Sequence, residues 1–263
     1  METIKKMEQE LIDLKKNYPI FDINVYIPSY RDEFLDDDIP TPEQILTEGV
    51  DKLVLADKHC MLGDIFEAND ALFERVKGND AFYASPIIVP EMHLGGRDFA
   101  AYLDYMIKNK AAILRAFPAY MKHSMKKWQM GDMFKAMEDR RIPLMVWHME
   151  TTFDTYADIA ENYPNLPIII EGSDQKTIYY VRDVMGLLER YDNIYLEMHN
   201  FSQYGFLPYC LENIGAERLL FGSFSPYNDM NGVLRMIDKH TTEEQKKLIL
   251  SGSFERLLAN IKR

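Results

Sequence analysis

The chain is poor in cysteine and in long apolar runs. Its two cysteines, Cys60 and Cys210, stand far apart in a sequence of 263 residues. They therefore form no closely spaced metal-binding pair and are typical of free thiols in a reducing compartment. No apolar run approaches the roughly 18 residues that a membrane span requires. Residues 1–16 lack the apolar centre of a signal peptide. We therefore expect a cytoplasmic protein with no membrane partner.

Positive charge is also scarce. The chain has 30 Lys and Arg against 42 Asp and Glu, which gives a net charge of -12. Phosphate binding needs clustered Lys and Arg, so we expect no nucleic-acid partner. The densest acidic run, Asp36–Asp38, is typical of a solvated loop rather than of a metal site.

Eight apolar segments of strand length alternate with helical patterns along the chain. The predicted strands cover 20–27, 52–56, 82–89, 111–117, 143–150, 167–172, 193–198 and 218–223. This alternation predicts a parallel sheet with helical crossovers, and eight units predict a (β/α)8 TIM barrel. We expect one domain over residues 1–263, with a short N-terminal helix at 2–17. The alternative is a doubly wound open sheet, but no glycine-rich phosphate loop follows the first strand.

Cap residues place several of the intervening helices. Thr41 precedes Pro42, which is typical of a helix start, and Gly78 and Asn79 end the next helix. Further helices are predicted over 130–140, 152–163, 177–190 and 208–216, and from about 229 and 242.

In a TIM barrel the functional site lies at the carboxyl ends of the strands. Five of the six histidines lie at or just after predicted strand ends, or in the loop after the fourth strand. Imidazoles gathered in this way are not typical of a core. We predict that His148 and Glu171 are catalytic. Six further residues are predicted to bind the substrate: Asn24, Tyr26, Arg115, His199, Ser223 and Tyr227.

Each of these assignments has a structural alternative. His148 can act as a general acid or base oriented by Glu171, or it can be a core histidine bonded to a carbonyl. Glu171 can equally form an ion pair with Arg115 or Lys58. His199 suits a pocket wall or an exposed loop. The cationic loop 117–128 can cover the site or can simply be solvated.

Six motifs carry a resemblance to a known family over nearly the whole chain. Ser223 lacks the Gly-x-Ser-x-Gly elbow of a serine nucleophile, and the six motifs are a guide to the fold more than to the activity. They are FDINVY at 21–26, IPLMVWH at 142–148, PNLPIII at 164–170, NIYLE at 193–197, AERLLFGS at 216–223 and GSFERLL at 252–258. The chain resembles the amidohydrolase superfamily, in the branch that contains aminocarboxymuconate decarboxylase and related metal-dependent hydrolases and decarboxylases.

The resemblance implies a metal site that this sequence lacks for the most part. Family members bind metal through a His-x-His pair ending strand one, a histidine ending strand five and an aspartate after strand eight. Here these positions hold Asn24, Tyr26, His148 and Phe224, and Gly172 replaces the family's acid–base histidine. A catalytic zinc normally takes three protein ligands and a water molecule. Of the four ligand positions of the family, only the one at His148 still holds its histidine. We therefore expect no metal ligands and no cofactor, with a recruited zinc or manganese site as the alternative.

Three functions are compatible with this pattern. The first is hydrolysis or decarboxylation of a small carboxylated or cyclic metabolite at a rebuilt, metal-poor site around His148. The second is an inactive barrel that binds a small ligand, and the third is a barrel that binds a protein partner. A homodimer is compatible with each of them.

Overall fold

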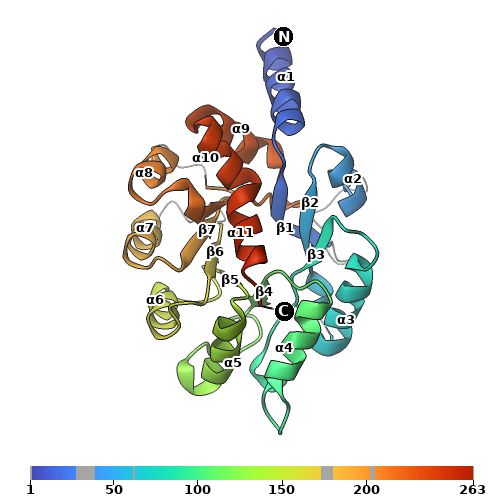
Figure 1. Ribbon diagram of the computed structural model, residues 1–263, viewed down its shortest axis with the longest axis vertical. Helices are drawn as coiled ribbons and strands as arrows, with labels where there is room; N and C mark the ends of the chain where they lie inside the picture. The colour runs from blue at the N-terminus through green and yellow to red at the C-terminus, as the bar shows by residue number, and fades with distance from the viewer. Residues whose placement is uncertain (1, 28–38, 62, 173–179, 202–204, 263) are drawn as a thin grey trace.

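The computed structural model describes residues 2–27, 39–61, 63–172, 180–201 and 205–262. Within these ranges it contains eight parallel strands surrounded by helices (Figure 1). The strands are β1 (Phe21–Ile27), β2 (Lys52–Asp57), β3 (Phe82–Ala84), β4 (Leu114–Ala116), β5 (Leu144–Trp147), β6 (Ile168–Glu171), β7 (Ile194–Glu197) and β8 (Leu219–Leu220).

The strands close into one barrel. β1 to β3 pair in sequence order, and so do β4 to β8. Parallel bridges from Ala84 to Ala111 and from Ile87 to Arg115 join the third strand to the fourth. A third bridge, from Val25 to Ser225, joins β1 to the chain that follows β8. The predicted TIM barrel is therefore confirmed, and the open-sheet alternative is wrong.

The helices begin and end close to the predicted positions. They are α1 (Glu2–Asn17), α2 (Pro42–Thr47), α3 (Ile65–Val76), α4 (Phe99–Lys108), α5 (Lys127–Arg140), α6 (Phe153–Asn162), α7 (Val181–Arg190), α8 (Phe206–Asn213), α9 (Met230–His240), α10 (Glu243–Lys247) and α11 (Ser253–Ala259). Thr41 and Thr242 each form a capping box with a glutamine three residues later. Residues 177–179 of the predicted seventh helix lie outside the described ranges. None of the described helices is long and apolar enough to cross a membrane.

The third strand is shorter than predicted. The apolar sequence of residues 87–89 predicts a strand that continues to Val89. In the structure these residues are indeed as buried as the strand itself. Pro86 has no backbone N–H to donate to a neighbouring strand, and β3 ends at Ala84. The chain beyond it stays close to β4 through the Ile87 bridge.

Helix α11 closes the amino-terminal end of the barrel. The inner core contains side chains from strands on opposite sides, together with Phe254 and Leu257 of α11. The Phe254 ring meets Phe21, the first residue of β1, edge to face at a centroid distance of 4.8 Å. In Figure 1 this red helix lies across the centre of the ring of strands. Because α11 covers the amino-terminal end, functional side chains can reach solvent only at the carboxyl end of the barrel.

Truncating the ring that closes the barrel should be costly. Phe254→Ala should lower the free energy of unfolding by about 3 to 5 kcal/mol, because it removes a buried ring and leaves a cavity. Chemical denaturation measures this loss. Ile4→Ala, on an exposed part of α1, is the control and should change stability by less than about 0.5 kcal/mol. Equal effects for the two variants would contradict the role of α11.

Candidate active site

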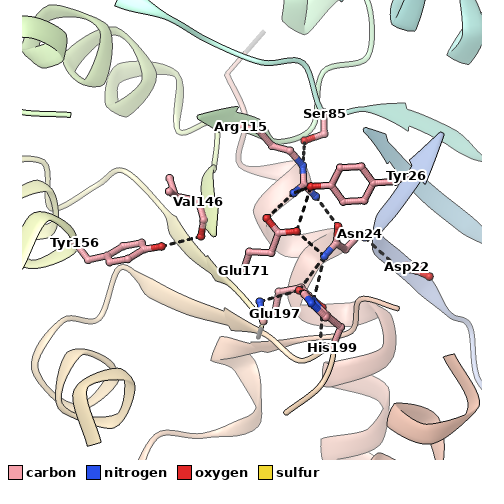
Figure 2. Close-up of polar contacts among 11 residues, drawn as sticks. Asp22, Asn24, Tyr26, Ser85, Arg115, Val146, Tyr156, Glu171, Glu197 and His199 are labelled. Carbon is pink, nitrogen blue, oxygen red and sulfur yellow. Dashed lines mark hydrogen bonds and ion pairs between the residues drawn. The ribbon is translucent and has the colours of Figure 1, made fainter. Parts of the chain in front are cut away.

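A buried arginine lies at the centre of the polar groups inside the barrel (Figure 2). Arg115, in β4, is 1% exposed. Its Nη1 donates to Glu171 Oε2 at 2.8 Å and to the Tyr26 hydroxyl at 2.9 Å, and its Nη2 donates to Asn24 Oδ1 at 2.8 Å. Its Nε donates to Ser85 Oγ at 3.0 Å. Burial lowers the pKa of Arg115, but Glu171 and Tyr26 outweigh it, so the pKa is raised and the guanidinium stays charged.

Asn24 connects this arginine to two carboxylates. An arginine can only donate, so the Asn24 amide must turn its oxygen toward Arg115. Its Nδ2 then donates to Glu171 Oε1 at 3.1 Å and to Glu197 Oε2 at 3.0 Å. One neutral side chain therefore holds the ends of β6 and β7 together.

Glu197 and His199 form a second buried ion pair. They lie two residues apart at the end of β7, so strand alternation puts both on one face. Glu197 Oε2 lies 2.5 Å from His199 Nδ1, and Glu197 Oε1 accepts from the His199 amide at 2.7 Å. Burial alone lowers the pKa of His199, but the Glu197 carboxylate outweighs it and the pKa is raised. Burial likewise raises the pKa of Glu197, but His199 and two backbone amides outweigh it and the pKa is lowered.

Two glycines make room for Glu197. A Cβ on Gly222 would lie 2.2 Å from Glu197 Oε1, and a Cβ on Gly172 would lie 2.5 Å from the His199 carbonyl oxygen. The Gly172 amide also donates to Glu197 Oε2 at 3.0 Å. Gly172, where the resembled family has a histidine, therefore has no space for any side chain.

An irregularity in β1 turns Asn24 and Tyr26 inward. The register between β1 and β2 shifts between Asp22 and Val25. Phe21 and Ile23 face the inner core, whereas Val25, two residues further on, packs in the outer core. Asp22 holds this bend because its Oδ1 accepts from the amides of Asn24 and Ser223 at 3.1 and 3.0 Å. A bulge of this kind re-aims side chains at barrel rims.

A cavity of about 300 Å³ opens above these ion pairs. Within the described ranges, five aromatic side chains contribute to its wall: Tyr26, Phe117, Tyr120, Trp147 and Phe224.

Polar side chains complete the lining, namely Lys58, Glu150, Glu171, His199 and Asn200. The ring of Phe224 stacks on the His199 imidazole at 4.6 Å and 13°. The cavity is therefore aromatic on its sides and ionic at its base.

The structure brings together five of the eight predicted site residues: Asn24, Tyr26, Arg115, Glu171 and His199. The ion pair with Arg115, which was the alternative for Glu171, is present.

The other three predicted residues have different surroundings. His148 is buried one residue beyond β5, where it stacks on Phe153 at 6.5 Å and meets Tyr180 at 5.9 Å. Its neighbour Trp147 lines the cavity, but His148 is not among the described lining residues.

Ser223 Oγ accepts from the Ser225 amide at 2.9 Å, which is a contact internal to the loop. Tyr227 packs beside the cavity against Tyr26 and Phe224.

Several residues that contribute to the site are absent from the predicted set. Glu197 is absent from the predicted site residues, although its spacing from His199 was a usable signal. Ser85 lies between the last residue of β3 and Pro86, inside the segment predicted as the third strand. Of the loop 117–128, the structure places Phe117 and Tyr120 on the cavity wall. Trp128 lies in a different surface hollow and is 78% exposed.

The fold and this site define a TIM barrel with an aromatic and ionic cavity at the carboxyl end, and comparison with solved structures agrees on the barrel fold. No family model matches the chain, and no curated protein matches it either. Among solved structures, an uncharacterized TIM-barrel protein from Bordetella bronchiseptica is similar at 15% identity and a TM-score of 0.71. That alignment covers 93% of this chain and 100% of the other.

Two enzyme structures are similar over comparable lengths. Dihydroxybenzoic acid decarboxylase from Polaromonas sp. JS666, with bound manganese and 2-nitroresorcinol, has 14% identity and a TM-score of 0.70, over 94% of this chain and 98% of the other. A putative 2-pyrone-4,6-dicarboxylic acid hydrolase from Pseudomonas putida has 13% identity and a TM-score of 0.66, over 94% and 100%. The expected likeness to amidohydrolase-type decarboxylases and hydrolases is confirmed for the fold.

The side chains present here do not fit a divalent metal. Within the described part of the chain, no group of three His, Cys, Asp or Glu side chains can hold an ion. The oxygens of Asn24 and Tyr26 already accept from Arg115. Phe224 offers an aromatic ring where the resembled family has a carboxylate. No chemical step is therefore assigned to a metal.

Gly222→Ala should displace Glu197. It should cost about 1 to 3 kcal/mol through overpacking, and NMR titration should show the pKa of His199 falling as its partner moves away. Gly186→Ala is the matched control, since nothing lies within 4 Å of the added Cβ. In the exposed interior of α7 it should gain about 0.5 to 1 kcal/mol. An unchanged His199 titration in Gly222→Ala would argue against this packing.

Asp22 should make stability depend on pH. Burial raises its pKa to about 6, above its unfolded value, so the stability it contributes is complete in acid and is lost as pH rises through about 6. Asp22→Asn keeps an acceptor oxygen for both amides and does not ionise. Denaturation should show the wild type losing stability relative to this variant between about pH 4 and about pH 8. Parallel curves would rule out this titration.

Proposed function

We propose that the protein is a decarboxylase of small, planar carboxylated metabolites, with His199 as the proton donor. The observation that carries this proposal is the Glu197–His199 pair at the base of an aromatic cavity. A raised pKa favours the protonated imidazole, which suits a general acid.

The reaction needs one proton and no oxidant or reductant. Nδ1 of His199 is held by Glu197, so Nε2 is the ring nitrogen left for the cavity that His199 lines. It donates a proton to the substrate carbon that carries the carboxylate. The bond between that carbon and the carboxylate then breaks, its electron pair stays with the substrate and carbon dioxide leaves. Water returns a proton to the neutral imidazole.

The cavity wall supports a flat, anionic substrate. Aromatic faces favour stacking with planar rings. The Lys58 ammonium, 3.6 Å from the Tyr227 ring centroid, brings positive charge to the same wall and attracts a carboxylate. The similar solved structures act, by their names, on dihydroxybenzoic acid and a pyrone dicarboxylic acid. We also propose that the chain belongs to the amidohydrolase superfamily. We propose further that its partner is a small molecule and not a nucleic acid.

Decarboxylation is favoured over hydrolysis by the raised pKa of His199, which suits proton donation to a substrate carbon better than removal of a proton from water. A catalytic role for His148 stays a prediction, and its position among aromatic rings makes it the natural comparison for His199.

Turnover of a panel of hydroxybenzoates and carboxylated pyrones, followed as carbon dioxide release, tests the proposal. His199→Asn should lower kcat by about 100-fold or more, and the wild type should lose kcat as pH rises through the raised pKa of His199. His93→Asn, whose ring contacts the Gln129 carbonyl, is the control and should keep full activity.

His148→Asn separates the two candidate acids. Activity lost in His148→Asn and kept in His199→Asn would reverse the assignment. Saturable binding of these acids without turnover by any preparation would favour the inactive, ligand-binding barrel instead.

A further inference from the structure

We propose that the Arg115 guanidinium is a built-in cation that takes the place of a divalent metal ion, so that this site is complete without a metal. The inference goes beyond the proposed reaction and does not depend on it. It concerns what holds the carboxyl end of the barrel together.

The first support is the set of acceptors around Arg115. Four oxygens from three segments of the chain, Asn24 Oδ1 and Tyr26 Oη of β1, Ser85 Oγ and Glu171 Oε2, accept from its three nitrogens at 2.8 to 3.0 Å. Oxygens converging on one positive centre are what a hard cation requires. Here the centre is part of the chain and cannot dissociate. Two of the four oxygens belong to Asn24 and Tyr26, at the positions where the resembled family has its His-x-His ligands.

The second support is the balance of charge. Arg115 pairs with Glu171, and His199 pairs with Glu197, all four at 3% exposure or less. With His199 protonated, the two positive and two negative groups cancel, and the buried Asp22, whose pKa is about 6, adds at most one further negative charge. A divalent ion added to this cluster would therefore leave at least one uncompensated buried positive charge, which is strongly unfavourable.

The third support is that both carboxylate oxygens of Glu197 already accept hydrogen bonds. Its Oε1 accepts from the His199 amide, and its Oε2 accepts from Asn24 Nδ2, the Gly172 amide and His199 Nδ1. A metal bound there would have to displace these donors. The carboxylate lies against Gly222, where even a Cβ would overlap it, and the Gly172 amide holds its Oε2, so turning toward another ligand would break these contacts.

Tyr26 is also in the wrong state to bind a metal. Burial, above all, raises its pKa well above the usual tyrosine value. The neutral phenol donates to Glu171 Oε1 at 3.3 Å while it accepts from Arg115. Its hydroxyl group therefore connects Arg115 to Glu171.

Metal content of the wild-type chain tests the proposal directly. The protein is incubated with manganese or zinc chloride, desalted and assayed for metal, and its melting temperature is measured with each salt and with EDTA. We expect far less than one ion per chain and an unchanged melting temperature. A specific ion would raise the melting temperature by linkage. One ion per chain whose removal by EDTA lowers the melting temperature would overturn the proposal.

A variant tests the positive role of the guanidinium. Arg115→Ala should lower the melting temperature by many degrees, and millimolar ethylguanidinium should restore part of the loss. Arg75→Ala is the matched control, because Arg75 forms an exposed ion pair with Glu43 and should melt near the wild type with or without ethylguanidinium. An Arg115→Ala protein that melts like the wild type would refute the proposal. Should this variant not fold, the metal assay on the wild type decides alone, and neither result depends on turnover.

Discussion

The ion pair between Arg115 and Glu171 is the contact on which the carboxyl end of the barrel depends. Taking two charges out of water costs several kcal/mol for each ion, and their attraction offsets this only when other groups satisfy the remaining donors and acceptors. Asn24, Tyr26 and Ser85 do so here. The network ties β1, β4 and β6 to the chain beyond β3, so removing any member leaves a buried charge short of a partner.

The second ion pair is coupled to the first through Asn24. Its amide donates to both Glu171 and Glu197 and accepts from Arg115. A change of charge at His199 therefore alters the field at Glu197 and is felt through Asn24 at the arginine. Because these groups are almost completely buried, the surrounding water screens their interaction only weakly. Chemistry at the cavity base and cohesion of the barrel are thus parts of one electrostatic system.

Much of this arrangement could be predicted from local patterns. Cap residues such as Thr41 and Thr242 depend on their own hydrogen bonds, and the strand–helix alternation depends on burial, so both can be read along the chain. The side on which a residue beyond a strand end lies depends on contacts between segments. His148, one residue past β5, faces Phe153 and Tyr180, and the bulge at Asp22 changes the phase of β1. Neither event has a signature in a single segment.

The two glycines beside Glu197 indicate that the site is adapted to this carboxylate and is more than the remnant of a lost metal centre. A pocket that loses its ligands without a new role should fill with apolar side chains, since nothing then opposes packing. Gly222 instead keeps space that any side chain would close, and the Glu197 carboxylate occupies it, while Gly172 lets the backbone of Glu197 and His199 approach closely. Phe224 stacks on His199 where a metal-binding carboxylate is expected from the resemblance. The substitutions are consistent with one another because each positions the imidazole or its carboxylate, which is the pair that the proposed proton transfer uses.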